Sequence, residues 1–166
     1  DRDRRAALPA AERSRSDAAF AEFQARQVTA IVRQVRDSLR AVRPALLLSA
    51  AVRPNAAEAA RHYGQPWVEW LEQGLLDRAF PMCYSPDTQT VLEQLLWMGD
   101  PALRARVVPG IAVYNAGPTR VASHLKGVRA LGFEHLALYS YDSLFARARY
   151  WERLHELLAP EDGAQP

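Results

Sequence analysis

Tyrosine side chains stand at the ends of three apolar runs in the sequence, at Tyr84, Tyr114 and Tyr141. An aromatic ring can stack on the C–H face of a flat polyhydroxylated ligand, while its phenol exchanges hydrogen bonds with the ligand's hydroxyls. One tyrosine at a strand end is commonly a half-buried packing residue. Three at equivalent places favour a binding role instead, and sugars are ligands of this kind.

Two aspartates follow two of these tyrosines closely in the sequence, and one arginine directly follows a fourth apolar run. Asp142 directly follows Tyr141, and Asp87 lies three residues after Tyr84. Hydrolysis of a glycosidic bond needs two carboxyl groups, one acid and one nucleophile or base, and Asp142 is the candidate catalytic residue. Both aspartates are also suitable helix N-caps; we expect Asp87 mainly to cap a helix, with substrate binding as its second role. Arg53 follows another apolar run and either binds a ligand hydroxyl or carboxylate or faces solvent.

Several other chemistries lack the residues that they need. None of the eight glycines belongs to a Gly-x-Gly-x-x-Gly or Walker loop, and there is no Gly-x-Ser-x-Gly elbow. Cys83 is the only cysteine, so we expect it to fill the core, without a disulfide or a thiolate metal site. The histidines are scattered without the spacing of metal ligands, so we expect neither a metal nor a cofactor: His62, His124, His135 and His155.

The composition is that of one globular domain. The chain has 166 residues, of which 49% are hydrophobic and 24% charged, with a net charge of +2, and this length suffices for a real core. The arginines are spread over the chain instead of forming the basic stripe of a nucleic-acid-binding protein. No apolar run has the length of a membrane span, and no signal peptide is visible.

The N-terminal part predicts an arm followed by a long helix. Residues 1–16 are charged and contain proline, which is typical of an irregular arm. From Ser16 or Asp17, both good N-cap residues, a helix is expected to run to Val42, and Pro44 ends it. Its apolar residues recur at three- and four-residue spacing: Phe20, Phe23, Val28, Ile31, Val35, Leu39 and Val42. At the other end, residues 159–166 are predicted to form a disordered tail.

Four apolar runs follow the long helix at intervals of about 30 residues: 45–52, 78–84, 106–114 and 134–141. Each is apolar on both alternating faces, as expected of a parallel strand that is covered on both sides. Helix signals separate the runs, with Asn55, Asp87 and either Asp142 or Ser143 as caps. The pattern predicts an α/β fold of four consecutive parallel strand-helix units with right-handed crossovers.

The functional edge of such a sheet lies at the carboxyl ends of its strands. We therefore expect the candidate residues to gather around one rim: Arg53, Tyr84, Asp87, Tyr114, Tyr141 and Asp142. Four units are too few to close a barrel, which usually needs eight. The fold is thus either half of a closed barrel or a free-standing open sheet, and only the open sheet would carry helices on both faces.

Four segments of the chain resemble one protein family. They are "FAEFQARQVTAIVRQVRDSLRAVRPALLLSAAV", "GQPWVEWLEQGLLDRAFPMCYSPD", "VVPGIAVY" and "LALYSYDSL", between about residues 20 and 145. In order and spacing they resemble the second half of the bacterial glycosyl-hydrolase-like family 10 type barrel, which is distantly similar to the amylase clan. The resemblance implies that 17–158 is half of a TIM-barrel domain, strands five to eight of a (β/α)8 barrel. The family's acidic motif on strand four is absent here, and Pro66 stands where an Asp is common.

What the resemblance implies about function is a carbohydrate-active glycoside hydrolase that acts on a polysaccharide outside the cytoplasm. The chain would be a fragment, inactive without the missing N-terminal half of the same barrel, which carries the other carboxylate. The alternative is a noncatalytic glycan-binding or scaffold protein on the same fold. We also expect the fragment to self-associate, because a half barrel exposes edge strands and inward-facing apolar side chains.

Overall fold

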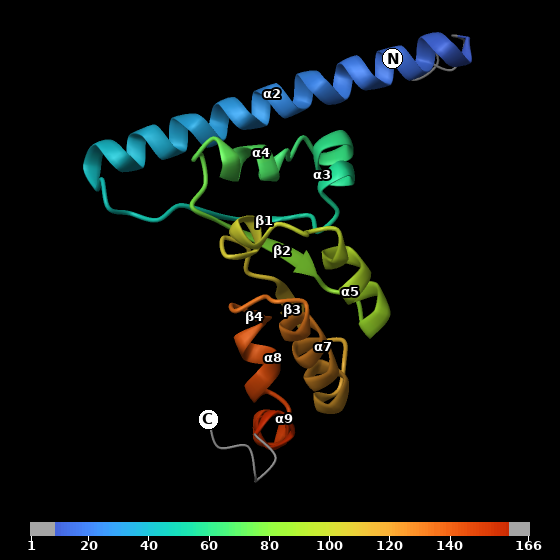
Figure 1. Ribbon diagram of the computed structural model, residues 1–166, viewed down its shortest axis with the longest axis vertical. Coiled ribbons are helices and arrows are strands. Elements are labelled where there is room, and N and C mark those ends of the chain that lie inside the picture. Colours follow the sequence, from blue (N-terminus) through green and yellow to red (C-terminus); the bar gives the residue numbers. More distant parts are fainter. Residues whose placement is uncertain (1–8, 160–166) are drawn as a thin grey trace. The chain divides into compact units, whose positions relative to one another are not determined.

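The computed structural model describes residues 9–159, in which four strands alternate with helices in an α/β fold (Figure 1). The chain divides into two compact units, Asp1–Asp77 (unit 1) and Arg78–Pro166 (unit 2), where the sequence pattern predicts one domain over 17–158. Most of the predicted tail, residues 160–166, lies outside the described residues, as do the first eight residues of the predicted arm.

Unit 1 consists of the long helix α2 (Ala10–Val42), strand β1 (Ser49–Val52) and the short helices α3 (Ala56–Tyr63) and α4 (Trp67–Glu72). Helix α2 begins directly after Pro9, so the prediction of an irregular arm up to residue 16 is wrong from Ala10 onward. The reason is local: Ala10, Ala11 and Glu12 are good helix formers, and an acidic residue in the first turn complements the helix dipole. The helix ends at Val42, as Pro44 predicts.

Two tryptophans of α4 belong to the core of unit 1. Trp67 and Trp70 are both buried. The indole of Trp70 donates a hydrogen bond to the Thr29 hydroxyl at 2.8 Å, and that of Trp67 donates to the Arg53 carbonyl at 3.0 Å. Each indole N–H is thus paired, as a buried indole requires, and α4 is fixed against both α2 and the end of β1.

Unit 2 carries the other three strand-helix repeats. Its strands are β2 (Arg78–Cys83), β3 (Gly110–Ala112) and β4 (Ala137–Tyr139). They pair in parallel in chain order, with Met82 opposite Gly110 and Gly110 opposite Ala137. The helices are α5 (Thr88–Leu96), α6 (Pro101–Arg104), α7 (Pro118–Ala130), α8 (Tyr141–Phe145) and α9 (Tyr150–Leu158). Parallel strands alternating with helices were predicted from the repeat, and this part of the fold prediction is confirmed.

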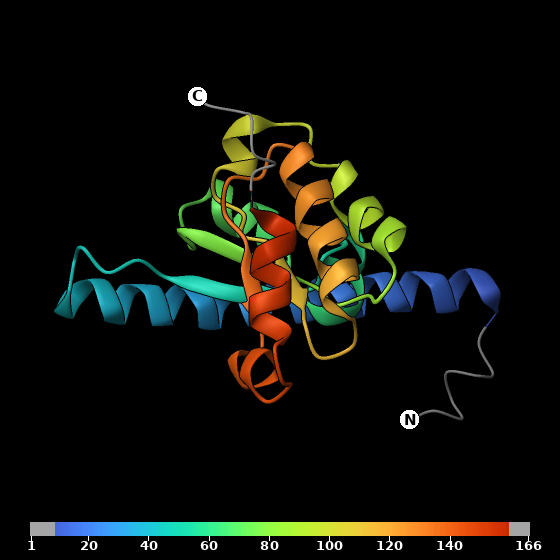
Figure 2. The same ribbon diagram turned by 90° about the horizontal axis from the view of Figure 1, so that it is seen from below.

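Three helices of unit 2, α5, α7 and α9, form one layer. Neighbouring parallel strands in chain order are joined by right-handed crossovers, which place α5 and α7 on the same face of the sheet. Helix α7 packs between α5 and α9 (Figure 2). Along β2, the buried residues Ala79, Pro81 and Cys83 alternate with the half-buried Phe80 and Met82. One face of β2 is therefore covered more completely than the other, whereas the sequence predicted a strand covered on both sides.

Candidate functional site

Three tyrosine rings meet at the carboxyl edge of the unit 2 sheet. Tyr84 and Tyr139 stack at 5.2 Å between ring centroids, with 13° between their planes. Tyr114 stands edge-on to both, 6.2 Å from each, at 80° to Tyr84 and 85° to Tyr139. We call these three residues the tyrosine cluster. Each comes from the end of a different strand, β2, β3 or β4.

The strand register explains why two of the rings stack. Cys83 lies opposite Ile111, and Ala112 lies opposite Tyr139, so Tyr84 and Tyr139 flank Ala112 on one face of the sheet. The small Ala112 side chain leaves the space above it to the two rings. Gly110 lies beneath the Tyr84 ring: a Cβ at this position would lie 3.4 Å from Cε1 of the ring and 3.3 Å from the Pro81 carbonyl oxygen.

The cluster is open to solvent on one side. Tyr84 is half-buried, whereas Tyr114 and Tyr139 are 49% and 53% exposed. Burial raises the pKa of Tyr84, and its neighbours Tyr139 and Tyr114 raise it further. The Tyr84 phenol therefore keeps its proton at neutral pH, when it can both donate and accept a hydrogen bond. The arrangement offers ring faces, ring edges and phenol groups within one small area.

Tyr139 was missed by the sequence interpretation, which placed Tyr141 at this edge. Strand β4 ends at Tyr139, and Tyr141 already opens helix α8. Tyr141 is 73% exposed, and its ring lies 4.6 Å from that of Phe145, so the cluster's third ring is Tyr139. The sequence could have indicated Tyr139, because it lies two residues before Tyr141 and residues two apart in a strand point to the same face. The predicted run 134–141 extends beyond the strand at both ends, by three residues before Ala137 and by two after Tyr139.

Asp142 lies in the first turn of α8 with its side chain exposed. Its carboxylate makes no hydrogen bond or ion pair within residues 9–159. The prediction that Asp142 or Ser143 caps the last helix is wrong, because Ser140 occupies the cap position of α8. The predicted helix is also split in two: α9 starts after Arg149, which has a φ of 58°.

Asp87 is the N-cap of α5, as predicted. Its Oδ1 accepts hydrogen bonds from the Thr90 backbone N–H at 2.8 Å and from the Thr90 hydroxyl at 2.9 Å. These two bonds lower the pKa of the Asp87 carboxyl below its ordinary value of 3.8. The carboxylate therefore stays ionised near neutral pH and is already engaged by the helix. Its predicted second role, in substrate binding, stays a prediction.

Arg53 belongs to unit 1, directly after β1. Its guanidinium lies 4.5 Å from the centroid of the Tyr63 ring and donates a hydrogen bond to the Tyr63 hydroxyl at 2.9 Å. The side chain is exposed. Arg53 is thus held by a cation–π contact in its own unit, and its role as a ligand-binding residue stays a prediction.

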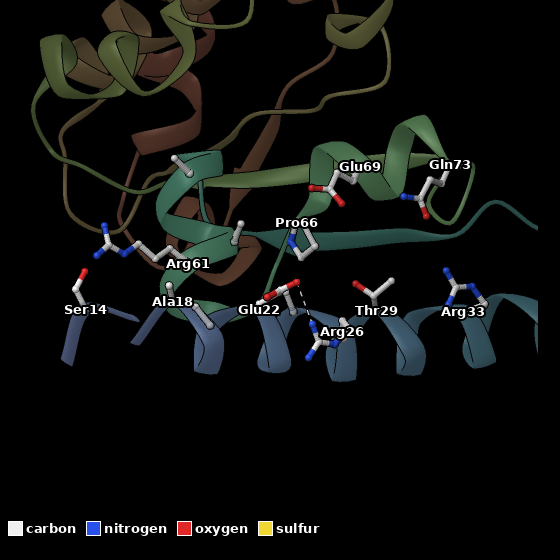
Figure 3. Close-up of a pocket in the computed structure, with 14 residues that line it drawn as sticks. Ser14, Ala18, Glu22, Arg26, Thr29, Arg33, Arg61, Pro66, Glu69 and Gln73 are labelled. Atoms are coloured by element: carbon white, nitrogen blue, oxygen red, sulfur yellow. Dashed lines mark ion pairs between the residues drawn. The ribbon is translucent and has the colours of Figure 1, made fainter. Parts of the chain in front are cut away.

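A groove of about 820 Å³ in unit 1 has a different chemistry. It runs beside α2, whose Ala18, Ala21 and Ala25 contribute small side chains to its lining. Figure 3 shows Glu22 and Arg26 of α2, an ion pair at 3.1 Å, on the side opposite Pro66 and Glu69. No aromatic ring lines this groove, so it offers no stacking surface for a sugar.

No family model matches the chain, and no curated protein sequence is significantly similar to it. Among residues 9–159, no three His, Cys, Asp or Glu side chains are grouped so that they could hold a metal ion. None of the helices described in this range is long and apolar enough to cross a membrane.

Proposed function

We propose that the tyrosine cluster binds a saccharide and that the chain is part of a carbohydrate-active, glycoside-hydrolase-like protein. The supporting observation is the contact of three partly exposed tyrosine rings from three successive strand ends. Pyranose rings present C–H faces that stack on aromatic rings and hydroxyls that bond to phenols. Tyr114 stands nearly at right angles to the other two rings, so a sugar could contact a ring face and phenol groups together.

Hydrolysis is the second part of the proposal, and Asp142 is its candidate acid/base or substrate-positioning residue. Asp142 lies three residues after Tyr139, with an exposed carboxylate that is free of partners within residues 9–159. A glycosidase needs a second carboxyl group across the scissile bond, and Asp87 is occupied by its cap. We propose that the second carboxylate comes from another half of the same barrel, which would supply the remaining strands of eight. The single helix layer of unit 2 supports this architecture.

A titration with soluble oligosaccharides tests the binding proposal. We expect the ring resonances of Tyr84, Tyr114 and Tyr139 to shift in NMR spectra, and each change to Ala to weaken binding about tenfold, since one aromatic contact is worth about 1 kcal/mol or more. Trp97→Ala is the matched control, because Trp97 is an exposed ring at the opposite end of α5 from Asp87. If no oligosaccharide of a broad panel moves these resonances, the proposal fails.

The alternative, a noncatalytic glycan-binding protein, is favoured by one observation. No carboxylate within residues 9–159 is hydrogen-bonded to a phenol of the cluster. Asp142→Asn in the full-length gene product separates the two functions, since the change removes the ionisable group and keeps the shape. Loss of turnover with retained affinity supports hydrolysis, whereas affinity without any turnover in the unchanged protein supports the noncatalytic function.

A further inference from the structure

Arg147, between α8 and α9, holds the loop that carries Tyr114. Its guanidinium donates hydrogen bonds to three backbone carbonyls, those of Val113, Ala116 and Ser143. Two of these acceptors belong to residues 113–116, which lie between β3 and α7. The Val113 N–H still donates to the Tyr139 carbonyl of β4 at 2.8 Å, whereas the carbonyls of Val113 and Ala116 accept hydrogen bonds from side chains. A guanidinium suits the task because its fork presents several N–H groups in fixed directions.

Tyr150 holds the same loop from α9. Its hydroxyl donates a hydrogen bond to the Ala116 carbonyl at 2.8 Å, and the residue is buried. The Arg147 guanidinium lies 3.9 Å from the centroid of the Tyr150 ring. The Arg147 and Tyr150 side chains therefore contact each other, and both donate a hydrogen bond to the Ala116 carbonyl.

On its other side the loop is tied to the end of β2. The Asn115 side chain donates a hydrogen bond from Nδ2 to the Tyr84 carbonyl at 2.8 Å. Tyr114, next to Asn115, then contacts both Tyr84 and Tyr139 with its ring. A continuous set of contacts thus leads from Arg147 and Tyr150, through residues 113–116, to the tyrosine cluster.

We infer that Arg147 and Tyr150 are positioning residues that set the edge-on orientation of Tyr114 in the cluster, and so its affinity for saccharide. The part that concerns the ligand rests on the proposed function. Neither residue needs to touch the sugar. Their effect arises because a loop with unpaired carbonyls would take other conformations, and the Tyr114 ring would then leave the two rings that it contacts.

The test uses Arg147→Lys and Tyr150→Phe. Lysine keeps the positive charge of Arg147 but lacks the several N–H donors of the guanidinium. Phenylalanine keeps the aromatic ring beside the guanidinium but lacks the hydroxyl that donates a hydrogen bond to the Ala116 carbonyl. We expect the NMR cross-peaks between the Tyr114 ring and the rings of Tyr84 and Tyr139 to weaken in both variants, while those between Tyr84 and Tyr139 persist. Saccharide affinity should fall about three- to tenfold, the effect of losing one charge-assisted hydrogen bond or less. Arg153→Lys is the control, because Arg153 is an exposed arginine on α9, the helix of Tyr150, and pairs with Glu156.

The outcomes separate the two proposals. If no saccharide binds the unchanged protein but the Tyr114 cross-peaks weaken as expected, the positioning inference holds and the binding proposal fails. If saccharide binds and both variants keep the cross-peaks and the affinity of the unchanged protein, the inference is overturned and the binding proposal stands. Should Arg147→Lys fail to fold, Tyr150→Phe gives the same readout, and unchanged cross-peaks in that variant overturn the inference.

Discussion

Cys83 ends β2 with its thiol inside the helix-covered face of unit 2, and burial raises its pKa to about 12. Thiolate is the reactive form of cysteine, so this thiol should resist alkylation. We predict that Ellman's reagent does not modify the native protein at pH 8 and does so at once in guanidinium chloride. Ser123→Cys, at an exposed position of α7, should react without denaturant. Rapid labelling of native Cys83 would contradict its burial.

Asp87 predicts a pH dependence of stability. Its folded-state pKa is lowered by the two bonds from Thr90, so its contribution is complete above the unfolded-state value, near 3.8, and is lost as the pH falls through the folded-state value. We expect Asp87→Ala to lower the Tm at pH 7 and to differ little from the unchanged protein in strong acid. Asp87→Asn keeps an acceptor for Thr90 without titrating. Calorimetric Tm values that fall equally at both pH values would argue against a titrating cap.

His124 is buried in α7, and neither ring nitrogen makes a hydrogen bond of good geometry within the described range. Burial lowers its pKa below 6.5, and Arg120 lowers it further, more than the Pro86 carbonyl and the Asp87 carboxylate raise it. The unfolded chain then takes up the proton first, so stability decreases as the pH falls from 6.5 through the folded-state value. His124→Leu should remove this decrease in urea-unfolding experiments. A variant whose stability falls with pH as before would exclude His124 as the cause.

The environment of a single residue was predicted correctly where its neighbours in the sequence determine it. Asp87 caps because a carboxylate before "TQT" has backbone N–H groups to bind, and Cys83 is buried because its run is apolar. Tyr141 was predicted in place of Tyr139 because the sequence does not show at which residue the chain leaves the sheet. Partners across the sheet decide that point, and they are not neighbours in sequence.

Among the helices, α5 and α7 approach closely at Gly127. A Cβ there would lie 2.9 Å from Cδ2 of Leu92, so the missing side chain makes room for the leucine. We predict that Gly127→Val destabilises the protein by about 1–3 kcal/mol, the usual cost of overpacking, and that Leu92→Ala in the same chain recovers part of this loss. Valine has a higher helix propensity than glycine, so a loss of stability in Gly127→Val reports the overpacking and not the helix propensity. Additive effects of the Gly127 and Leu92 changes in denaturant titrations would disprove the contact.

Helix ends could be predicted where proline, glycine or a polar cap marks them, as at Pro44, Asn55 and Pro118. The split between α8 and α9 could not, because the residue with positive φ there is Arg149 and not glycine. The early start of α2 was missed for a related reason. Residues 10–16 are charged, and charge alone does not distinguish an exposed helix from an irregular arm.

For the molecule as a whole, exposed aromatic side chains predict association between chains. Tyr141, Phe145 and Trp151 form a run of ring contacts on α8 and α9 and remain largely exposed. Contiguous apolar surface of this kind promotes association. We predict concentration-dependent dimers or larger species in sedimentation velocity, reduced in the double variant Phe145→Ser, Trp151→Ser with unchanged far-UV circular dichroism. A monomer at every concentration would contradict this.

The alternation of strands and helices could be predicted from the sequence because the apolar runs recur at similar intervals of about 30 residues. The division after Asp77 could not be predicted, since no Pro, Gly or Ser-rich stretch marks it and β2 begins at the next residue. Composition and period predict neither the proposed glycosidase-like barrel nor the proposed catalytic role of Asp142. Both proposals depend on which ligand the cluster binds.

Gly110 gives protein engineers an adjustable position beneath the Tyr84 ring. A methyl group there would lie 3.3 Å from the Pro81 carbonyl oxygen, which is a tight contact, and 3.4 Å from Cε1 of Tyr84, so it would crowd the backbone beneath this ring while all three tyrosines are retained. Under the proposed function, Gly110→Ala and Gly110→Ser form a graded series for changing which sugars the tyrosine cluster prefers. On the same proposal, a substitution at this one position would change selectivity without replacing any tyrosine of the cluster.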